Sequence, residues 1–224
     1  MEKAKIREIF LSVQGEGSHV GERQLFIRFC KCNLKCNYCD TDFESEKSSD
    51  YDAQTLLDKV NSFGRELVLS LTGGEPLMSA DFLEEFLPLA KKSGHKIYLE
   101  TNGTLPDSLK EVIDYVDVVS ADIKLKSSTG MDIKFSLVHE FLRVASQKET
   151  FAKIVFDKNI TEEEILKSVE IAKNCNIEII LQPMMIGNNF AVSTEFCEEI
   201  FDKFCKLYTK VRIIPQMHKF LNVR

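Results

Sequence analysis

The chain has 224 residues, 44% of them hydrophobic, and a formal net charge of −6. This length and apolar content are enough to bury one sizeable core, and they predict a single domain over residues 1–224. The negative charge argues against bulk nucleic acid as a partner. Residues 1–10 lack the apolar run of a signal peptide, and no segment approaches the roughly 18 apolar residues that a membrane span needs. We therefore expect a cytoplasmic protein with no membrane partner.

Apolar runs rich in Val, Ile and Phe alternate along the chain with stretches of helical spacing. The apolar runs predict seven strands, at residues 24–30, 66–72, 96–101, 116–123, 151–157, 177–183 and 211–215. The stretches between them predict six helices, near residues 53–63, 81–92, 107–115, 133–146, 162–173 and 194–207. The polar stretch 44–52 is predicted to be a solvated loop.

Regular alternation of strands and helices is typical of a parallel sheet with right-handed crossovers. Six or seven units are too few for a closed eight-stranded barrel, so the sequence predicts an α/β fold with an incomplete, open barrel. Ligands of such folds bind at the carboxyl ends of the strands. Unusual polar residues follow the predicted strands at these ends: Cys32, Cys36, Cys39, Gly73, Gly74, Glu75, Pro76, Asn102, Gly103, Asp122, Lys124, Gln182, Gln216 and His218.

Four of the seven cysteines crowd into residues 30–39, and the other three are scattered far downstream. This distribution does not suit a disulfide framework, and clustered cysteines indicate a metal site or catalysis. Cys32, Cys36 and Cys39 can hold three corners of a 4Fe–4S cluster, which leaves one iron open for a further ligand. A zinc site is the alternative, but structural zinc needs a second ligand pair, and His19 is the only imidazole nearby. Cys30 falls in the alternating pattern of a strand.

The spacing of these three cysteines, with Tyr38 before the last, resembles the radical S-adenosylmethionine superfamily. The resemblance implies that the open iron binds the methionine part of the cofactor, and that one electron from the cluster releases a 5′-deoxyadenosyl radical. The run from Thr72 to Pro76 resembles the second motif of the superfamily, whose glycines suit close backbone approach. Glu100 to Gly103 are further candidates for cofactor contact. The implied cofactor contacts are Tyr38, Cys39, Asp40, Gly74, Ser120, Ala121, Asp122, Lys124, Leu181, Gln182, Pro183 and Met184.

The run from Ser12 to Gly17, together with Arg28, Cys39-Asp40-Thr41 and Leu181 to Met184, resembles the 7-carboxy-7-deazaguanine synthase family over nearly the whole chain. That family contracts the ring of 6-carboxy-5,6,7,8-tetrahydropterin and expels ammonia, on the route to deazaguanine nucleosides such as queuosine. By this resemblance a hydrogen is taken from C6 of the pterin and later returned, and no side chain need act as acid or base. The implied substrate contacts are Val13, Gln14, Gly15, Glu16, Arg28, Thr72 and Arg224.

The residue types suit such a substrate, because a pterin edge needs donors and acceptors and a carboxylate needs a cation. Gln14 and Glu16 can form hydrogen bonds with the pterin edge, and Arg28, on a rigid strand, can bind the carboxylate. The resemblance further implies a Mg²⁺ ion held by the hydroxyl of Thr41. It also implies a homodimer and an external electron donor, such as a flavodoxin-like protein.

Two other functions remain open at this point. A glycyl-radical activating enzyme of the same superfamily would need an open groove for a polypeptide, and it would have no use for Gln14, Glu16 and Arg28. A noncatalytic iron–sulfur or zinc module would leave the second motif unexplained. Without the resemblance, residues 14–17 are more typical of a solvent-exposed glycine-rich turn than of a substrate site.

Overall fold

The computed structural model describes residues 2–39 and 48–223. Its centre is a curved nine-stranded sheet, with the strands in the order β11-β8-β7-β6-β5-β4-β2-β1-β3. The strands are β1 (Ala4–Val13), β2 (Arg23–Phe29), β3 (Ser49–Tyr51), β4 (Val68–Gly73), β5 (Lys96–Thr101), β6 (Val118–Asp122), β7 (Glu149–Phe156), β8 (Glu178–Pro183) and β11 (Val211–Ile213). A separate small hairpin joins β9 (Met185–Ile186) to β10 (Asn189–Phe190).

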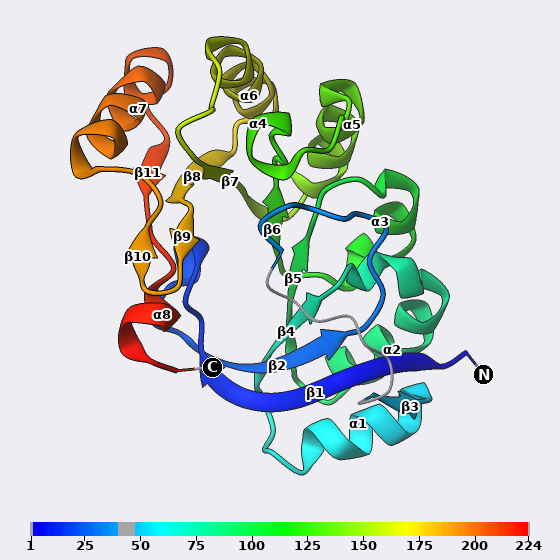
Figure 1. Ribbon diagram of the computed structural model, residues 1–224. Coiled ribbons are helices and arrows are strands. Elements are labelled where there is room, and N and C mark those ends of the chain that lie inside the picture. Colours follow the sequence, from blue (N-terminus) through cyan, green and yellow to red (C-terminus); the bar gives the residue numbers. More distant parts are fainter. Residues whose placement is uncertain (1, 40–47, 224) are drawn as a thin grey trace.

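Helices follow the strands and cover the outer side of the sheet (Figure 1). They are α1 (Ala53–Asn61), α2 (Ala80–Lys92), α3 (Pro106–Val112), α4 (Lys126–Thr129), α5 (Phe135–Ala145), α6 (Glu162–Cys175), α7 (Thr194–Leu207) and α8 (Met217–Leu221). Short 3₁₀ helices are η1 (Gly17–His19), η3 (Pro76–Ser79) and η4 (Ile113–Tyr115). None of the helices in the described part of the chain is long and apolar enough to cross a membrane.

The predicted open barrel is confirmed. The seven predicted strands correspond to β2, β4, β5, β6, β7, β8 and β11, and all neighbouring pairs among them run parallel. The six predicted helices correspond to α1, α2, α3 with η4, α5, α6 and α7. Among the described residues β11 and β3 are the two ends of the sheet and do not pair with each other, so the barrel stays open.

The expectation of a purely parallel sheet is wrong at one end. β1 pairs antiparallel with both β2 and β3, and residues 49–51, predicted as loop, form the short strand β3. The pattern of β1 is hard to recognise because charged residues such as Lys5 and Glu8 interrupt its apolar positions, and a register shift between Ile6 and Glu8 breaks the alternation. β1 covers the edge that β2 would otherwise expose.

The core lies between the sheet and its helices. Each core helix turns one apolar stripe inward, as α1 does with Leu56, Leu57 and Val60, and Asp52 caps its first turn by accepting a hydrogen bond from Thr55 N at 2.8 Å. Burial of each large apolar side chain contributes roughly 1.5–3 kcal/mol to folding. Packing of the helices on the outer face holds the strands in place. Polar side chains at the carboxyl ends of the strands can therefore face the inner, concave side.

Candidate active site

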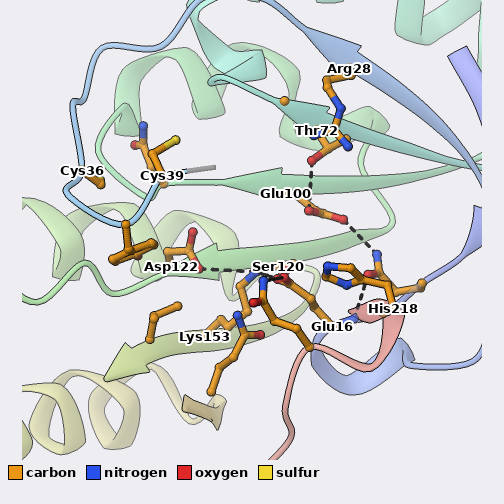
Figure 2. A pocket seen from close by; sticks show the side chains of 18 of the residues that line it. Glu16, Arg28, Cys36, Cys39, Thr72, Glu100, Ser120, Asp122, Lys153 and His218 are labelled. Atoms are coloured by element: carbon orange, nitrogen blue, oxygen red, sulfur yellow. Dashed lines mark hydrogen bonds and ion pairs between the residues drawn. The ribbon is translucent and has the colours of Figure 1, made fainter. Parts of the chain in front are cut away.

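A cavity of about 600 Å³ opens at the carboxyl ends of the parallel strands, within the size range of small-molecule sites (Figure 2). Most of the residues predicted from the sequence line it: Val13, Gln14, Gly15, Glu16, Arg28, Cys32, Cys36, Tyr38, Cys39, Thr72, Gly74, Ser120, Asp122, Lys124, Gln182 and Met184. The side chains of Ala121 and Leu181 instead belong to the hydrophobic core, and Pro183 is buried beside them without lining the cavity. Asp40, Thr41 and Arg224 lie outside the described residues.

The cysteine loop forms one wall of this cavity. Leu34 N donates to Cys32 Sγ at 3.4 Å, and Cys39 N donates to Cys36 O at 3.1 Å, so the loop is held by its own backbone. Burial raises the pKa of the Cys32 and Cys36 thiols, while Cys39 is exposed. Cys30 is buried and does not line the cavity, as its strand position predicted.

The glycine motif that follows β4 packs directly against the cysteine loop. Glu75 N donates to Lys31 O at 2.6 Å, and a Cβ on Gly74 would lie only 1.9 Å from the same oxygen. Any side chain at this position would therefore force the two loops apart. Glycine is required at this position because the backbone of the cysteine loop leaves no room for a side chain.

Hydrogen bonds among Asn33, Asn102 and Thr104 anchor the start of the cysteine loop, and Asn102 and Thr104 are buried. Asn102 Nδ2 donates to Asn33 Oδ1 at 2.8 Å and lies 3.9 Å from Cys32 Sγ. Thr104 Oγ1 donates to Asn102 Oδ1 at 2.6 Å and accepts from Asn33 Nδ2 at 2.9 Å. Buried polar groups of this kind specify one arrangement because each has a partner.

Glu75 ties the glycine motif to the end of β5. Its carboxyl group is 1% exposed and accepts from Leu77 N, Asn102 N and Thr101 Oγ1 at 2.7–3.1 Å. Burial raises the pKa of Glu75 to about 7, against the opposing effect of these three hydrogen bonds. Because its oxygens already accept hydrogen bonds from Leu77, Thr101 and Asn102, Glu75 stabilises the conformation of the glycine loop.

Two buried acceptors face the cavity without a hydrogen-bond donor among the described residues. These are Asp122 Oδ1, at the end of β6, which lies 3.7 Å from Lys153 Nζ, and Gln182 Oε1, on β8. The other oxygen of Asp122 pairs with Lys124 Nζ at 2.8 Å, and Lys124 also donates to Tyr38 OH at 3.0 Å. An unpaired buried acceptor costs free energy unless a ligand or water donates to it. The cofactor side of the cavity thus offers acceptors for hydroxyl and amino groups.

The chemistry of the donor set suits an iron–sulfur cluster and S-adenosylmethionine. Within the described ranges no three His, Cys, Asp or Glu side chains meet closely enough to hold one metal ion between them. The corners of a cubic cluster lie further apart than the ligands of a single ion, and three cysteines on one loop suit such spacing. The unpaired oxygens of Asp122 and Gln182 match the ribose hydroxyls and the adenine amino group of the cofactor.

A second group of polar side chains lies across the cavity from the cysteines (Figure 2). Gln14 is only 3% exposed, so the exposed turn that the glycines could have indicated does not form. Its Nε2 donates to Glu100 Oε1 at 2.9 Å and to Gln24 Oε1 at 3.2 Å. Thr72 Oγ1 donates to Glu100 Oε2 at 3.0 Å. Glu100 therefore joins two of the predicted substrate contacts, Gln14 and Thr72, on this wall of the cavity.

Glu16 is held from both sides. One oxygen, Oε2, forms a short ion pair with Lys153, and the other, Oε1, accepts from Gln216 Nε2 at 2.7 Å. Burial alone would raise the pKa of Glu16, but Lys153 and Gln216 lower it to about 2. Lys153 was not predicted from the sequence. A lysine inside the apolar run of β7 was the signal that could have revealed it.

Arg28 and the C-terminal segment complete this wall. Arg28 Nε donates to Glu8 Oε1 at 2.8 Å, and its guanidinium lies 5.9 Å from the centre of the Phe10 ring. Met217 N donates to Gly15 O at 2.8 Å, and the ring of His218 packs on Gly15 so closely that a Cβ there would lie 2.4 Å from Nδ1. The C-terminal segment thus returns to the predicted substrate residues.

Comparisons with known proteins agree with this geometry. Residues 26–192 match the model of the Radical SAM superfamily. The chain is 35% identical to the 7-carboxy-7-deazaguanine synthase of Geobacter sulfurreducens, with 97% of each chain covered. It is also 35% identical to the enzyme of that name from Archaeoglobus fulgidus, covering 99% of this chain and 100% of the relative.

Solved structures show the same fold at lower identity. QueE from Escherichia coli superposes with a TM-score of 0.67 at 20% identity, over 96% of this chain and 95% of that chain. A radical SAM methyltransferase from Sphaerobacter thermophilus reaches 0.60 at 9% identity, over 92% and 77%. By the full-length sequence matches, the chain belongs to the radical SAM superfamily and, within it, to the 7-carboxy-7-deazaguanine synthase family.

Proposed function

We propose that this protein contracts the ring of 6-carboxy-5,6,7,8-tetrahydropterin to 7-carboxy-7-deazaguanine with release of ammonia, as a step toward deazaguanine nucleosides such as queuosine. The observation that carries the proposal is the joint lining of one cavity by Cys32, Cys36 and Cys39 on one wall and by Gln14, Glu16 and Arg28 on another. Family membership supplies the reaction class. A 4Fe–4S cluster with bound S-adenosylmethionine supplies one-electron radical chemistry in this superfamily.

The residues on the cofactor side bind and orient. Cys32, Cys36 and Cys39 would hold the cluster through three irons and leave the fourth open to the methionine part of S-adenosylmethionine. Asp122 Oδ1 and Gln182 Oε1 would accept hydrogen bonds from the ribose and the adenine, which gives both buried oxygens the hydrogen-bond donors they lack among the described residues. Six residues that line the cavity would complete the contacts: Tyr38, Cys39, Gly74, Ser120, Lys124 and Met184. Asp40, Ala121, Leu181 and Pro183 are proposed by resemblance alone.

The residues on the substrate side recognise a flat, polar heterocycle with one carboxylate. Gln14, whose Nε2 donates to Glu100 and Gln24, and the ionised Glu16 present fixed acceptors to the pterin edge. Thr72 reaches the same wall through Glu100, and the backbone of Val13 and Gly15 lies beside it. Arg28 would bind the carboxylate through the terminal N–H groups of its guanidinium, beside the Nε–H that donates to Glu8.

The small polar cavity favours this function over activation of a partner protein. A polypeptide substrate gives no role to a buried Gln14 or to a carboxylate held ionised at Glu16. For these reasons the glycyl-radical activating enzyme is the weaker proposal.

Several further features are proposed from the family resemblance. Thr41 would donate its hydroxyl to a Mg²⁺ ion that touches the substrate, and Arg224 would contact the substrate from the C-terminus. The electron would come from an external flavodoxin-like donor. We also propose that the chain acts as one domain, in a homodimer, in the cytoplasm.

The test is anaerobic reconstitution of the cluster followed by turnover with the carboxylated pterin, dithionite and S-adenosylmethionine. Mass spectrometry should detect 7-carboxy-7-deazaguanine and an equal amount of ammonia. Cleavage of S-adenosylmethionine without any deazaguanine would refute the substrate while leaving the radical class intact.

A further inference from the structure

A buried cation lies between the two sides of the cavity. Lys153 stands in the middle of β7, where the residues from Phe151 to Phe156 are all buried, and it is itself 7% exposed. Burying a lysine costs free energy unless anionic partners surround it. Nothing in the packing of a parallel strand requires a charge at this position. The lysine therefore indicates a role in the cavity that β7 borders.

The contacts of Lys153 link it to Glu16 first. Its Nζ forms the short ion pair with Glu16 Oε2, and it lies 3.7 Å from Asp122 Oδ1. Gln216 Nε2 donates to the other oxygen of Glu16. Two donors, one on β7 and one in the C-terminal segment, thus fix the plane of one carboxylate. Each oxygen accepts further hydrogen bonds, because a carboxylate offers about four lone-pair sites.

We infer that Lys153 is a positioning residue for the substrate, which holds Glu16 ionised and oriented so that it accepts hydrogen bonds from the amino and N–H groups of the pterin edge. The inference rests on the proposed function, since it assigns a role within the same site. An ionised carboxylate only accepts, so it matches an edge that carries donors. A protonated Glu16 would present its own donor to those donors and lose the match.

Several charged and polar groups around Glu16 and Lys153 change the pKa values of these two residues. Glu16 faces Lys153 from β7 and His218 and Gln216 from the C-terminal segment, and Lys153 also faces Asp122 on β6 and Glu100 on β5. Burial alone would lower the pKa of Lys153, but Glu16, Asp122 and Glu100 raise it above its ordinary value. Burial would raise the pKa of Glu16 if Lys153 were neutral.

Replacement of the cation tests this role. In Lys153→Met, Glu16 keeps its burial and loses its cation, so its pKa rises and ionisation fails as the pH falls. We expect the KM for the carboxylated pterin to rise by about ten- to hundredfold near neutral pH, as for loss of a hydrogen bond to a charged group. A new acidic limb should enter the pH profile of kcat/KM, and raising the pH should recover part of the loss. Lys153→Arg should restore the wild-type profile.

Binding gives a readout that does not depend on turnover. Equilibrium dialysis of 6-carboxypterin, the fully oxidised analogue, against the reconstituted enzyme with S-adenosylmethionine should show the same loss of affinity in Lys153→Met. The matched control is Lys158→Met, the same change at an exposed lysine just after β7, which should bind the analogue as wild type does. A Lys153→Met variant with unchanged KM, pH profile and analogue affinity would overturn the inference.

A folding failure of Lys153→Met does not end the test. Glu16→Gln is a neutral replacement that should lose affinity at every pH, and the double variant with Lys153→Met removes both buried charges together. Wild-type affinity in Glu16→Gln would overturn the inference. If the wild-type enzyme neither binds the analogue nor forms deazaguanine, the proposed function fails and the inference fails with it. If the wild type is active and the Lys153 and Glu16 variants match its KM and analogue affinity, only the inference fails.

Discussion

Gln216 Nε2 donates a hydrogen bond to Glu16 Oε1 at 2.7 Å and so joins two residues 200 positions apart in the chain. The contact brings the C-terminal segment, with α8, onto the turn after β1, where Met217 N also donates to Gly15 O. The wall of the cavity is therefore built from both ends of the sequence. Mutations at either end should change the same binding site.

Gly15→Ala tests this link between the two ends. A Cβ at Gly15 would lie 2.4 Å from His218 Nδ1, so the C-terminal segment has to move and Gln216 leaves Glu16. We expect the affinity for 6-carboxypterin to fall by about tenfold. Because α8 has no buried residue, the free energy of unfolding should change by less than about 1 kcal/mol.

The control for this change is Gly21→Ala, in the same turn region. A Cβ there meets nothing within 4 Å, although the positive φ of +95° strains the backbone. It should reduce stability without reducing affinity for the analogue. Equal affinity in Gly15→Ala and wild type would contradict the proposed packing of the C-terminal segment on the site.

The cysteine assignments predict a simple spectroscopic difference. Replacing Cys32, Cys36 or Cys39 with Ala should abolish the visible absorption of the reconstituted cluster, because each supplies one of only three thiolates. The same change at the buried Cys30 should leave the absorption in place, as should changes at Cys175, Cys197 and Cys205. A requirement for any fourth cysteine would refute the open iron that S-adenosylmethionine needs.

The ion pair of Glu16 predicts how stability depends on pH. The pKa of Glu16 is lowered from 4.5 to about 2 in the folded protein. Its ionisation therefore stabilises the fold above pH 4.5, and this contribution, about 3 kcal/mol, is lost as the pH falls from 4.5 toward 2. Urea unfolding at pH 5 and pH 3 should show a steeper loss for wild type than for Glu16→Gln. Identical pH dependence of the two proteins would count against the ion pair.

Arg28 provides a prediction about the substrate carboxylate. Arg28→Lys keeps the charge but loses the planar fork that binds a carboxylate with two hydrogen bonds. We expect the affinity for 6-carboxypterin to fall by about tenfold, while the affinity for unsubstituted pterin, which lacks the carboxylate, should not change. Arg23→Lys, at the exposed start of β2, is the control. An equal loss of affinity for both ligands would show that Arg28 does not bind the carboxylate.

Much of the fold follows from hydrophobic pattern alone. The parallel strands are continuous apolar runs, and their order of alternation with helices leaves little choice of architecture. β1 escaped prediction because its charged residues and register shift hide the alternation, and β3 escaped because three residues that pair only at an edge carry almost no pattern. Pairing between distant segments decides such strands, and a local reading of the sequence does not contain it.

The site was predictable where chemistry and strand ends coincide. Cys32, Asp122 and Lys124 end or follow predicted strands and line the cavity, whereas Gln14 and Arg28 were expected there only from the family resemblance. Lys153 was missed because a strand interior normally faces the core, and only the curvature of the open sheet makes the inner face at that position border a cavity. The partnership of Gln216 with Glu16 depends on the path of the C-terminal segment, which no local pattern specifies.

The most direct test of the account is turnover of 6-carboxytetrahydropterin that carries deuterium at C6. The account predicts 7-carboxy-7-deazaguanine in excess over the S-adenosylmethionine consumed, with deuterium appearing in recovered S-adenosylmethionine. Accumulation of 5′-deoxyadenosine without deuterium and without deazaguanine would contradict it.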